Sequence, residues 1–237
     1  MISVLLASVL LAFFAGLSDL LSGIIPFYYK IEDSSTRYII GFAAGTMLGA
    51  VFFEMLPELA PADSIYIGVG FFFFYLLERL TMIHSCGEYE CTSEVHRIGW
   101  LPVIGMASDN IIDGIGIAVA YAINPLTGII VGLSVIVHEV PQGITTNLLL
   151  RRGGQGKKSI LLALGIGSIL YPIGAALSIL VPAGLNTIIL AIVTGDFLYI
   201  AASDLLPDAH KKFNIKVIFS VILGAVLVFA IESFLKM

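Results

Sequence analysis

The chain has 237 residues, of which 58% are hydrophobic and only 12% are charged, and its formal net charge is −5. Soluble domains carry roughly 25% charged residues, so this composition excludes a soluble globular protein. About eight apolar segments are long enough to cross a hydrocarbon core of roughly 30 Å; they lie at 2–25, 38–60, 64–83, 99–122, 127–149, 159–181, 187–208 and 213–235. The sequence predicts an all-α polytopic membrane protein, with a single membrane domain over residues 1–237, the lipid bilayer around it and no nucleic-acid partner.

The basic residues predict its orientation. Of the twelve Lys and Arg residues, all but Lys236 fall between, or in the adjoining ends of, segments 1 and 2, 3 and 4, 5 and 6, or 7 and 8. Cytoplasmic loops are enriched in Lys and Arg, so both termini are expected outside the cytoplasm, with the protein in the cell membrane. The first segment lacks a basic start and is expected to be a span, not a cleaved signal peptide.

Acidic residues occur inside the first two apolar segments. Asp19 lies close to the cytoplasmic end of the first, so its carboxylate is expected to reach the membrane interface. Glu54 lies inside the second, where a carboxylate is costly unless it faces protein, water or a cation. We therefore consider Glu54 a candidate pathway residue.

The second and seventh segments end alike. At one constant offset, the residues Gly45, Glu54, Pro57 and Glu58 match Gly195, Asp204, Pro207 and Asp208. One interpretation is a duplicated three-helix unit, segments 1–3 and 6–8, inverted around a central pair in a 3+2+3 arrangement, as in many secondary transporters. The other is that an acidic-Leu-Pro-acidic exit is a common way to leave a membrane. The extent of the match favours duplication.

The connection at 84–98, between the third and fourth segments, holds four potential metal ligands: His84, Cys86, Cys91 and His96. Thiolates and imidazoles in one short segment can bind zinc. The C-x4-C spacing is not that of a regular zinc finger, and a reducing cytoplasm disfavours a disulfide. A metal-capturing loop and an ordinary polar loop are both compatible with this sequence.

The fourth and fifth segments carry polar residues at their centres. These are Asp109, Asn110 and Asp113 in the fourth segment and His138, Glu139 and Gln142 in the fifth. Spacings of three and four residues place each set on one face of a helix. The connection around Pro125 is so short that the two helices must be neighbours, which lets the two faces meet at one depth. The expected result is an oxygen-rich site for a cation, with one imidazole.

A cation would solve an electrostatic problem at this position. Asp109 and Asp113 lie one turn apart in an apolar segment, where two carboxylates repel each other and are expensive. The alternative is a protonated or hydrogen-bonded pair that merely joins helices. Because no Lys or Arg lies in the central part of any predicted span, with Arg79 and Lys216 close to span ends, cation binding is favoured.

Pro141 and its neighbours raise a second chemical alternative. The proline frees the carbonyl group of Val137 within the fifth segment, where an ion could use it. His138 and Glu139 also start an H-E-x-x-H-like pattern of zinc hydrolases, but its last position is Gln142 and the proline interrupts it. An intramembrane metalloenzyme is therefore the alternative and not the first choice.

The motifs DNIIDG at 109–114 and HEVPQG at 138–143, with the exits MLPE and LLPD, resemble the ZIP (Zrt/Irt-like) metal transporters. That family commonly shows H-N-x-x-D/E-G and H-E-x-P-x-x in its fourth and fifth spans. The resemblance implies eight spans, both ends outside, and often a homodimer. It also implies a midplane site, often binuclear, for zinc, iron or manganese. By position, the matching ligands are Asn110, Asp113, His138 and Glu139.

The sequence also departs from the family pattern. Asp109 stands where the family usually has His. Gln142 and Gly143 stand where a Glu or a second His is frequent, and Tyr171 stands where some members have an acidic residue. Met47 aligns with a position near the outer metal entrance. Exchanging imidazole for carboxylate shifts the preference towards manganese or ferrous iron. The changes at Gln142, Gly143 and Tyr171 weaken the case for a second bound ion.

Together these observations predict a divalent metal transporter, without enzymatic activity, that moves zinc, or else iron or manganese, into the cytoplasm. The metal site is expected to use Asp109, Asn110, Asp113, His138, Glu139 and Gln142, and the secondary or pathway residues are expected to be Met47, Glu54, Tyr171 and Asp204. The alternatives are the intramembrane metalloenzyme and a ZIP-like membrane protein that does not transport.

Overall fold

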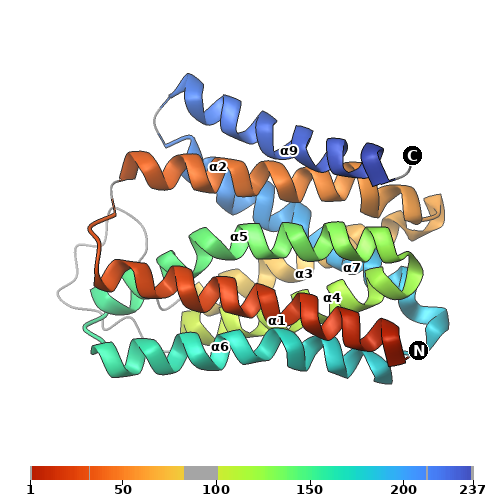
Figure 1. The fold of residues 1–237 in the computed structure, drawn as a ribbon, viewed down its shortest axis with the longest axis horizontal. Coiled ribbons are helices and arrows are strands. Elements are labelled where there is room, and N and C mark those ends of the chain that lie inside the picture. The colour runs from red at the N-terminus through yellow and green to blue at the C-terminus, as the bar shows by residue number, and fades with distance from the viewer. Residues whose placement is uncertain (1, 32, 83–100, 212, 236–237) are drawn as a thin grey trace.

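A computed structural model describes residues 2–31, 33–82, 101–211 and 213–235 (Figure 1). Its long helices are α1 (Ile2–Ile24), α2 (Asp33–Gly49), α3 (Ser64–Met82), α4 (Leu101–Ile123), α5 (Pro125–Arg152), α6 (Lys157–Leu177), α7 (Asn186–Tyr199) and α9 (Ile215–Leu235), with the short α8 (Leu206–Ala209). Brief 3-10 helices form the bends η1 (Ile25–Phe27), η3 (Leu56–Glu58), η4 (Pro61–Asp63), η5 (Ser178–Leu180) and η6 (Ala183–Leu185). No β-strand occurs within the described ranges, which confirms the all-α class.

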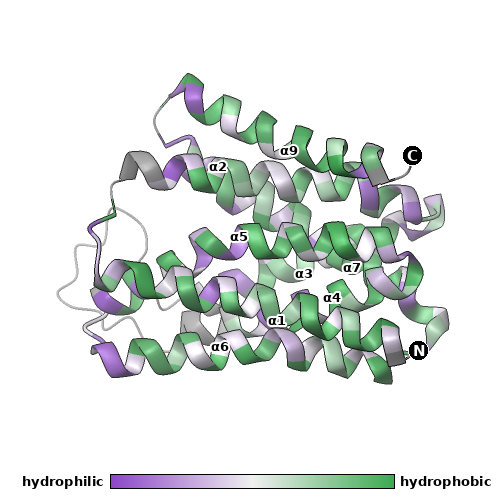
Figure 2. Ribbon diagram, viewed as in Figure 1, coloured by the Kyte–Doolittle hydropathy of each residue, from purple (hydrophilic) through white to green (hydrophobic). Residues whose placement is uncertain are grey.

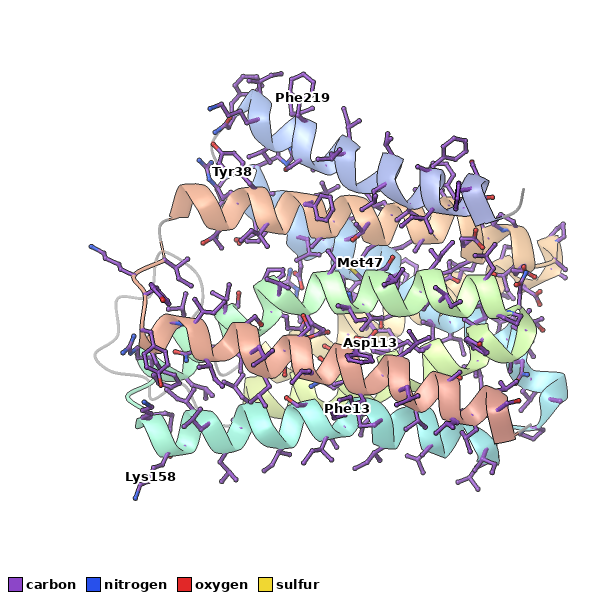
Figure 3. All side chains as sticks on the ribbon, viewed as in Figure 1. Phe13, Tyr38, Met47, Asp113, Lys158 and Phe219 are labelled. Atoms are coloured by element: carbon purple, nitrogen blue, oxygen red, sulfur yellow. The ribbon has the colours of Figure 1, made fainter. Side chains whose placement is uncertain are left out.

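The helices are those of a multi-pass membrane protein. Six helical stretches are long and apolar enough to cross a membrane, among the described residues. Helices α3 and α4 occupy the third and fourth predicted segments, so a total of eight spans stays a prediction. Apolar residues cover the bundle (Figure 2), and large side chains such as Phe13 and Phe219 point outwards (Figure 3). Both termini lie at the same end of the bundle, as an even number of crossings requires (Figure 1).

Helix packing follows the predicted inverted repeat. In the predicted repeat, α1, α2 and α3 correspond to α6, α7 and α9. The contact of α2 with α9 therefore corresponds to that of α7 with α3, and the contact of α1 with α5 corresponds to that of α6 with α4. Helix α1 also packs against α6, and α4 packs against α5. Gly45 and Gly195, the first residues of the matching segments, make matching contacts. A Cβ atom at Gly45 would overlap the carbonyl oxygen of Val221 in α9, and one at Gly195 would overlap that of Ile67 in α3.

A second shared feature is a π-helix. It covers η2 (Ala50–Met55) after α2 and η7 (Ile200–Leu205) after α7, six residues in each case and at the same offset. Single π-helical turns are rare and are found mostly at functional sites. Glu54 belongs to η2 and Asp204 to η7. Two matching π-helices favour duplication over a coincidental helix exit.

The turn between α4 and α5 fixes the central pair. Asn124 caps α5, since its side-chain oxygen accepts a hydrogen bond from the backbone nitrogen of Leu126 at 3.0 Å, and Pro125 is the first helical residue. Helix α5 continues through Pro141. This one-residue connection makes α4 and α5 antiparallel neighbours at the centre of the bundle, as the sequence predicts.

Candidate metal site

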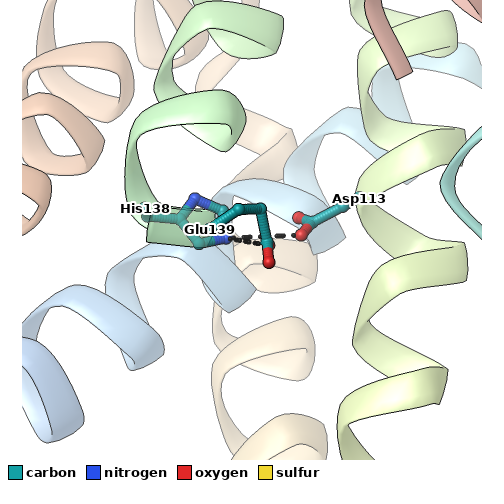
Figure 4. Close-up of side chains that lie close together, drawn as sticks. All are labelled: Asp113, His138 and Glu139. Atoms are coloured by element: carbon teal, nitrogen blue, oxygen red, sulfur yellow. Dashed lines mark ion pairs between the residues drawn. The ribbon is translucent and has the colours of Figure 1, made fainter. Parts of the chain in front are cut away.

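Asp113 of α4 meets His138 and Glu139 of α5 inside the bundle (Figure 4). One potential ligand atom from each residue lies within 4.8 Å of the other two. The His138 Nε2 atom is 2.9 Å from Glu139 Oε1 and 3.4 Å from Asp113 Oδ2. All three side chains are at most 1% exposed. Among the described residues, no other set of three His, Cys, Asp or Glu side chains comes this close.

The hydrogen bonding of His138 decides what its ring presents to the carboxylates. Its Nδ1 atom lies 3.2 Å from the carbonyl oxygen of Ser134, one turn earlier in α5. A carbonyl oxygen only accepts hydrogen bonds, so Nδ1 carries the proton in the neutral ring. The Nε2 lone pair then faces Asp113 and Glu139. This is the usual arrangement of a metal-binding histidine, which donates its other nitrogen to a backbone carbonyl.

The carboxylates of this cluster are unsatisfied. Both oxygens of Asp113 and both oxygens of Glu139 are buried without a hydrogen-bond partner, and so is Nε2 of His138. Buried charges are costly unless they are paired or bind a metal. The three side chains therefore direct lone pairs at one another, an arrangement that a divalent cation would turn from repulsive to attractive.

The remaining predicted ligands lie around this group. Asn110 is buried, and its Oδ1 atom has no hydrogen-bond partner. Asp109 is half-buried and lies outside the close group of three. Gln142 is one turn beyond His138, and its carbonyl oxygen accepts a hydrogen bond from Thr146. Tyr171 of α6 is fully buried next to Glu139, with no hydrogen-bond partner for its hydroxyl.

The pathway candidates fall into different environments. Met47 is fully buried in the main core (Figure 3). Glu54 is buried and accepts a hydrogen bond from Thr127 at 3.2 Å. Asp204 is exposed, and its charge interacts with those of Glu78 and Arg79. The loop candidates His84, Cys86, Cys91 and His96 lie outside the described residues.

Asp19 does not reach the membrane interface, so that prediction was wrong. The side chain is only 4% exposed. A Cβ atom at Gly143 of α5 would lie 2.9 Å from its Oδ1 atom, and one at Gly167 of α6 would lie 3.5 Å from its Oδ2 atom. Its charge interacts with those of His138 and Glu139. Asp19 thus faces the central cluster from α1.

A polar face on α1 explains the error. Ser18 donates a hydrogen bond to the carbonyl oxygen of Ile136 at 2.8 Å, and Ser22 donates one to that of Glu139 at 3.2 Å. These two serines are one turn apart and flank Asp19. The position of Asp19 near the end of the apolar segment suggested the membrane interface. The four-residue spacing of Ser18 and Ser22 could have indicated that this face of α1 is buried against another helix.

Asp196 of α7 is a second acidic residue to which the sequence analysis assigned no role. Its side chain is fully buried, and neither carboxylate oxygen has a hydrogen-bond partner. The next residue, Phe197, packs its ring edge-on against the ring of His138, with centroids 5.9 Å apart. The central site therefore has neighbours on α1 and α7 as well as on α4 to α6.

Comparison with known proteins addresses the family. A model of the ZIP zinc transporter family matches residues 84–232. Zinc transporter ZIP13 of Pongo abelii is 26% identical over 200 residues, which cover 74% of this chain and 59% of that protein. Metal cation symporter ZIP8 of Homo sapiens is 28% identical over 136 residues, which cover 56% of this chain and 29% of that protein. The chain thus spans less than two thirds of the length of these relatives. Because the family model matches more than half of its residues, the chain belongs to the ZIP zinc transporter family.

Proposed function

We propose that this protein moves a divalent cation across the membrane into the cytoplasm, and that Asp113, His138 and Glu139 bind the ion on the way. The observation that carries the proposal is the convergence of their unsatisfied ligand atoms inside the bundle. The names of the relatives, a zinc transporter and a metal cation symporter, support it. The family consists of transporters, which argues against the metalloenzyme alternative.

The donor set limits the ion. One imidazole and two carboxylates suit zinc, ferrous iron and manganese. Three protein ligands leave part of the coordination shell open, so an ion can exchange water for protein on entry and reverse this on release. We place zinc first because of the imidazole and the family. Asp109, in place of the usual His, would extend the range towards manganese.

An acidic cluster marks the proposed entry. Glu58 accepts hydrogen bonds from Asn124 at 2.7 Å and from Thr127 at 3.3 Å, and Thr127 also donates to Glu54. The cluster lies where α2 ends and α5 begins, at the end of the bundle that carries both termini (Figure 1). The distribution of basic residues predicts that this end faces outwards. Its carboxylates would concentrate cations at the mouth of the pathway.

An acidic region at the other end is the proposed exit. Glu78 accepts a hydrogen bond from the Tyr199 hydroxyl, and Asp208 pairs with Lys211. Asp204 lies between Tyr199 and Asp208 in the chain, and its side chain is exposed. Movement of helix bundles relative to one another would open the two ends in turn, in keeping with the inverted repeat. A homodimer, which the family resemblance implies, remains part of the proposal.

Metal uptake into proteoliposomes tests this function. We expect zinc uptake to fall more than about tenfold in Asp113→Ala and in His138→Ala, because each removes one of three ligands. Asp63→Asn, which changes a carboxylate outside the proposed pathway that accepts a hydrogen bond from the backbone nitrogen of Ala60, serves as the matched control and should retain wild-type uptake. Unchanged zinc, iron and manganese flux in both site variants would refute the assignment.

A further inference from the structure

Three membrane helices bring aromatic rings and basic side chains together at one end of the bundle. Phe27 is the last residue of η1, directly after α1, and Tyr28 follows it. The Nζ atom of Lys157, the first residue of α6, lies 5.1 Å from the centroid of the Phe27 ring and 5.2 Å from that of Tyr28. The Cζ atom of Arg151, near the end of α5, lies 5.9 Å from the Phe27 centroid. We call these four residues and Lys158 the basic-aromatic cluster.

The cluster is built on a buried base. Phe27 packs on apolar side chains of α5 and α6, which are Leu150, Ile160, Ala163 and Leu164. The Nη1 atom of Arg151 donates a hydrogen bond to the carbonyl oxygen of Pro26 at 3.1 Å. A cation within about 6 Å of an aromatic centroid is attracted to the face of the ring. The rings therefore hold the ammonium group of Lys157 in place without neutralising its charge.

No acidic side chain of the described residues balances this cluster. Arg151, Lys157 and Lys158 form no ion pair with a described carboxylate. The surrounding sequence, residues 20–31 and 143–166, contains no Asp or Glu. Lys211, at the same end of the bundle, does pair with Asp208. The basic-aromatic cluster thus presents positive charge that is available to an anion.

The cluster lies at the depth of lipid headgroups. The apolar stretches of α1, α5 and α6 that could cross a membrane end at Phe27, Arg151 and Lys157. Lys158 points away from the bundle at the start of α6 (Figure 3). This end is opposite to both termini (Figure 1), and the distribution of basic residues predicts that it faces the cytoplasm. The cytoplasmic leaflet is the one with a negative surface, because it carries anionic lipids.

Apolar surface continues from the cluster towards the membrane centre. Leu21 and Ile25 of α1 are exposed, and so are Leu162 and Ile166 of α6. The members of each pair are four residues apart, so they lie on one face of their helix. Helices α1 and α6 pack against each other. A ligand with a negative head and long apolar tails would match the charge of the cluster and the surface beside it.

Two simpler explanations do not account for the cluster. Lys157 and Lys158 lie in the first turn of α6, where positive charge opposes the helix dipole, so they do not serve to stabilise the helix. The cytoplasmic bias of basic residues explains the side of the membrane on which they lie. It does not explain why the rings of Phe27 and Tyr28 hold one of them.

We infer that the basic-aromatic cluster binds the phosphate group of an anionic phospholipid in the cytoplasmic leaflet. Arg151, Lys157 and Lys158 supply the positive charge, and the acyl chains lie along the exposed apolar faces of α1 and α6. Lys and Arg clusters beside membrane helices recognise anionic headgroups in this way. The bound lipid joins the cytoplasmic ends of α1, α5 and α6. The inference goes beyond the proposed function, since it concerns a surface outside the ion pathway.

Lipid binding to the purified full-length protein in a neutral detergent tests the inference. Native mass spectrometry measures the binding of phosphatidylglycerol, with phosphatidylcholine as a lipid without net charge and inorganic phosphate as an anion without tails. Phosphatidylglycerol should bind the wild type at least about tenfold more tightly than either. Lys157→Gln combined with Lys158→Gln should weaken its binding about tenfold or more, because each lysine near the membrane surface contributes about fivefold. Both side chains are exposed, so the fold should be retained.

Matched variants separate the cluster from general charge. Lys211→Gln combined with Lys216→Gln changes the net charge equally at the same end of the bundle and should bind phosphatidylglycerol as the wild type does. Lys157→Arg combined with Lys158→Arg keeps both charges and should also retain binding. Phe27→Leu keeps an apolar side chain on the buried base but removes the ring, and should weaken binding a few-fold.

The outcomes that overturn the inference are distinct. Equal losses in the two glutamine pairs would show that net charge, and not the basic-aromatic cluster, attracts the lipid. Equally tight binding of phosphatidylcholine would exclude recognition of charge, and equally tight binding of inorganic phosphate would exclude a contribution from the tails. None of these measurements involves a transported ion, so the proposed function is tested separately, by metal uptake in His138→Ala.

Discussion

The two π-helices, η2 and η7, share a backbone form and an acidic residue at the same register, yet their surroundings differ. Glu54 in η2 is 1% exposed and accepts a hydrogen bond from Thr127 of α5. Asp204 in η7 is exposed and interacts with Glu78 and Arg79 of α3. The matching sequences thus form the same π-helix in both repeats. The neighbouring helices differ, and they determine whether the carboxylate is buried and which groups it contacts.

This difference follows from the inversion of the repeat. Helices α2 and α7 run in opposite directions, so the same exit motif lies at opposite ends of the bundle. At one end the central helix α5 begins beside it and encloses Glu54. At the other end Asp204 faces the outside of the bundle. We therefore expect the first π-helix to select and admit ions, and the second to release them.

The largest expected effect tests whether the two repeats pack equivalently. In Gly45→Ala and Gly195→Ala the new Cβ atom would overlap a backbone carbonyl oxygen, which cannot move as freely as a side chain. Each variant should destabilise the protein by about 1–3 kcal/mol, the usual range for overpacking. Thermal unfolding followed by size-exclusion chromatography of detergent-solubilised protein measures the effect.

Gly68→Ala in α3 provides the control for this pair. Outside its own stretch of helix backbone, no atom lies within 4 Å of the Cβ position at Gly68, so its substitution should leave stability unchanged or slightly raised. A large loss at Gly45 with none at Gly195 would show that the two helix contacts are not equivalent, and would weaken the case for an inverted repeat.

Much of this arrangement could be predicted because it depends on local patterns. The apolar segments place the helices, and the short connection at Pro125 makes α4 and α5 neighbours. Three- and four-residue spacings then bring Asp113 and Glu139 to facing surfaces. Regular helix geometry and one tight turn are enough to predict this pairing, and no long-range information is needed.

Asp19 and Asp196 could not be assigned in the same way. Each lies on a helix far from α4 and α5 in sequence, and the rotation of that helix is set by packing against several partners. Gly143 and Gly167 leave the space that Asp19 occupies, and the contact between Val193 and Gly116 orients Asp196. Such contacts are decided by the tertiary structure, so hydropathy and spacing alone do not reveal them.

A smaller effect is expected from the acidic residues of the π-helices themselves. Glu54→Gln keeps an acceptor for Thr127 but removes a buried negative charge at the proposed entry, and should lower zinc uptake about tenfold. Asp204→Asn removes an exposed charge, which water and salt screen, so uptake should fall less than about threefold. Initial uptake rates over a range of zinc concentrations measure both, with the loss at Glu54 appearing mainly in KM. Equal losses at the two positions would contradict the proposed difference between entry and exit.

The smallest effect concerns Thr127, which holds the entry carboxylates in place. Thr127→Val removes the hydroxyl that donates to Glu54 and Glu58 but keeps the size and branching of the side chain. Because one hydrogen bond to a charged group contributes about 1.5–3 kcal/mol at most and water can replace part of it, uptake should fall only a few-fold. Thr127→Ser keeps the hydroxyl and should restore the wild-type rate. If Thr127→Ser is as impaired as Thr127→Val, the methyl group and not the hydrogen bond is what matters, and the entry would depend on packing around α5 rather than on the orientation of its carboxylates.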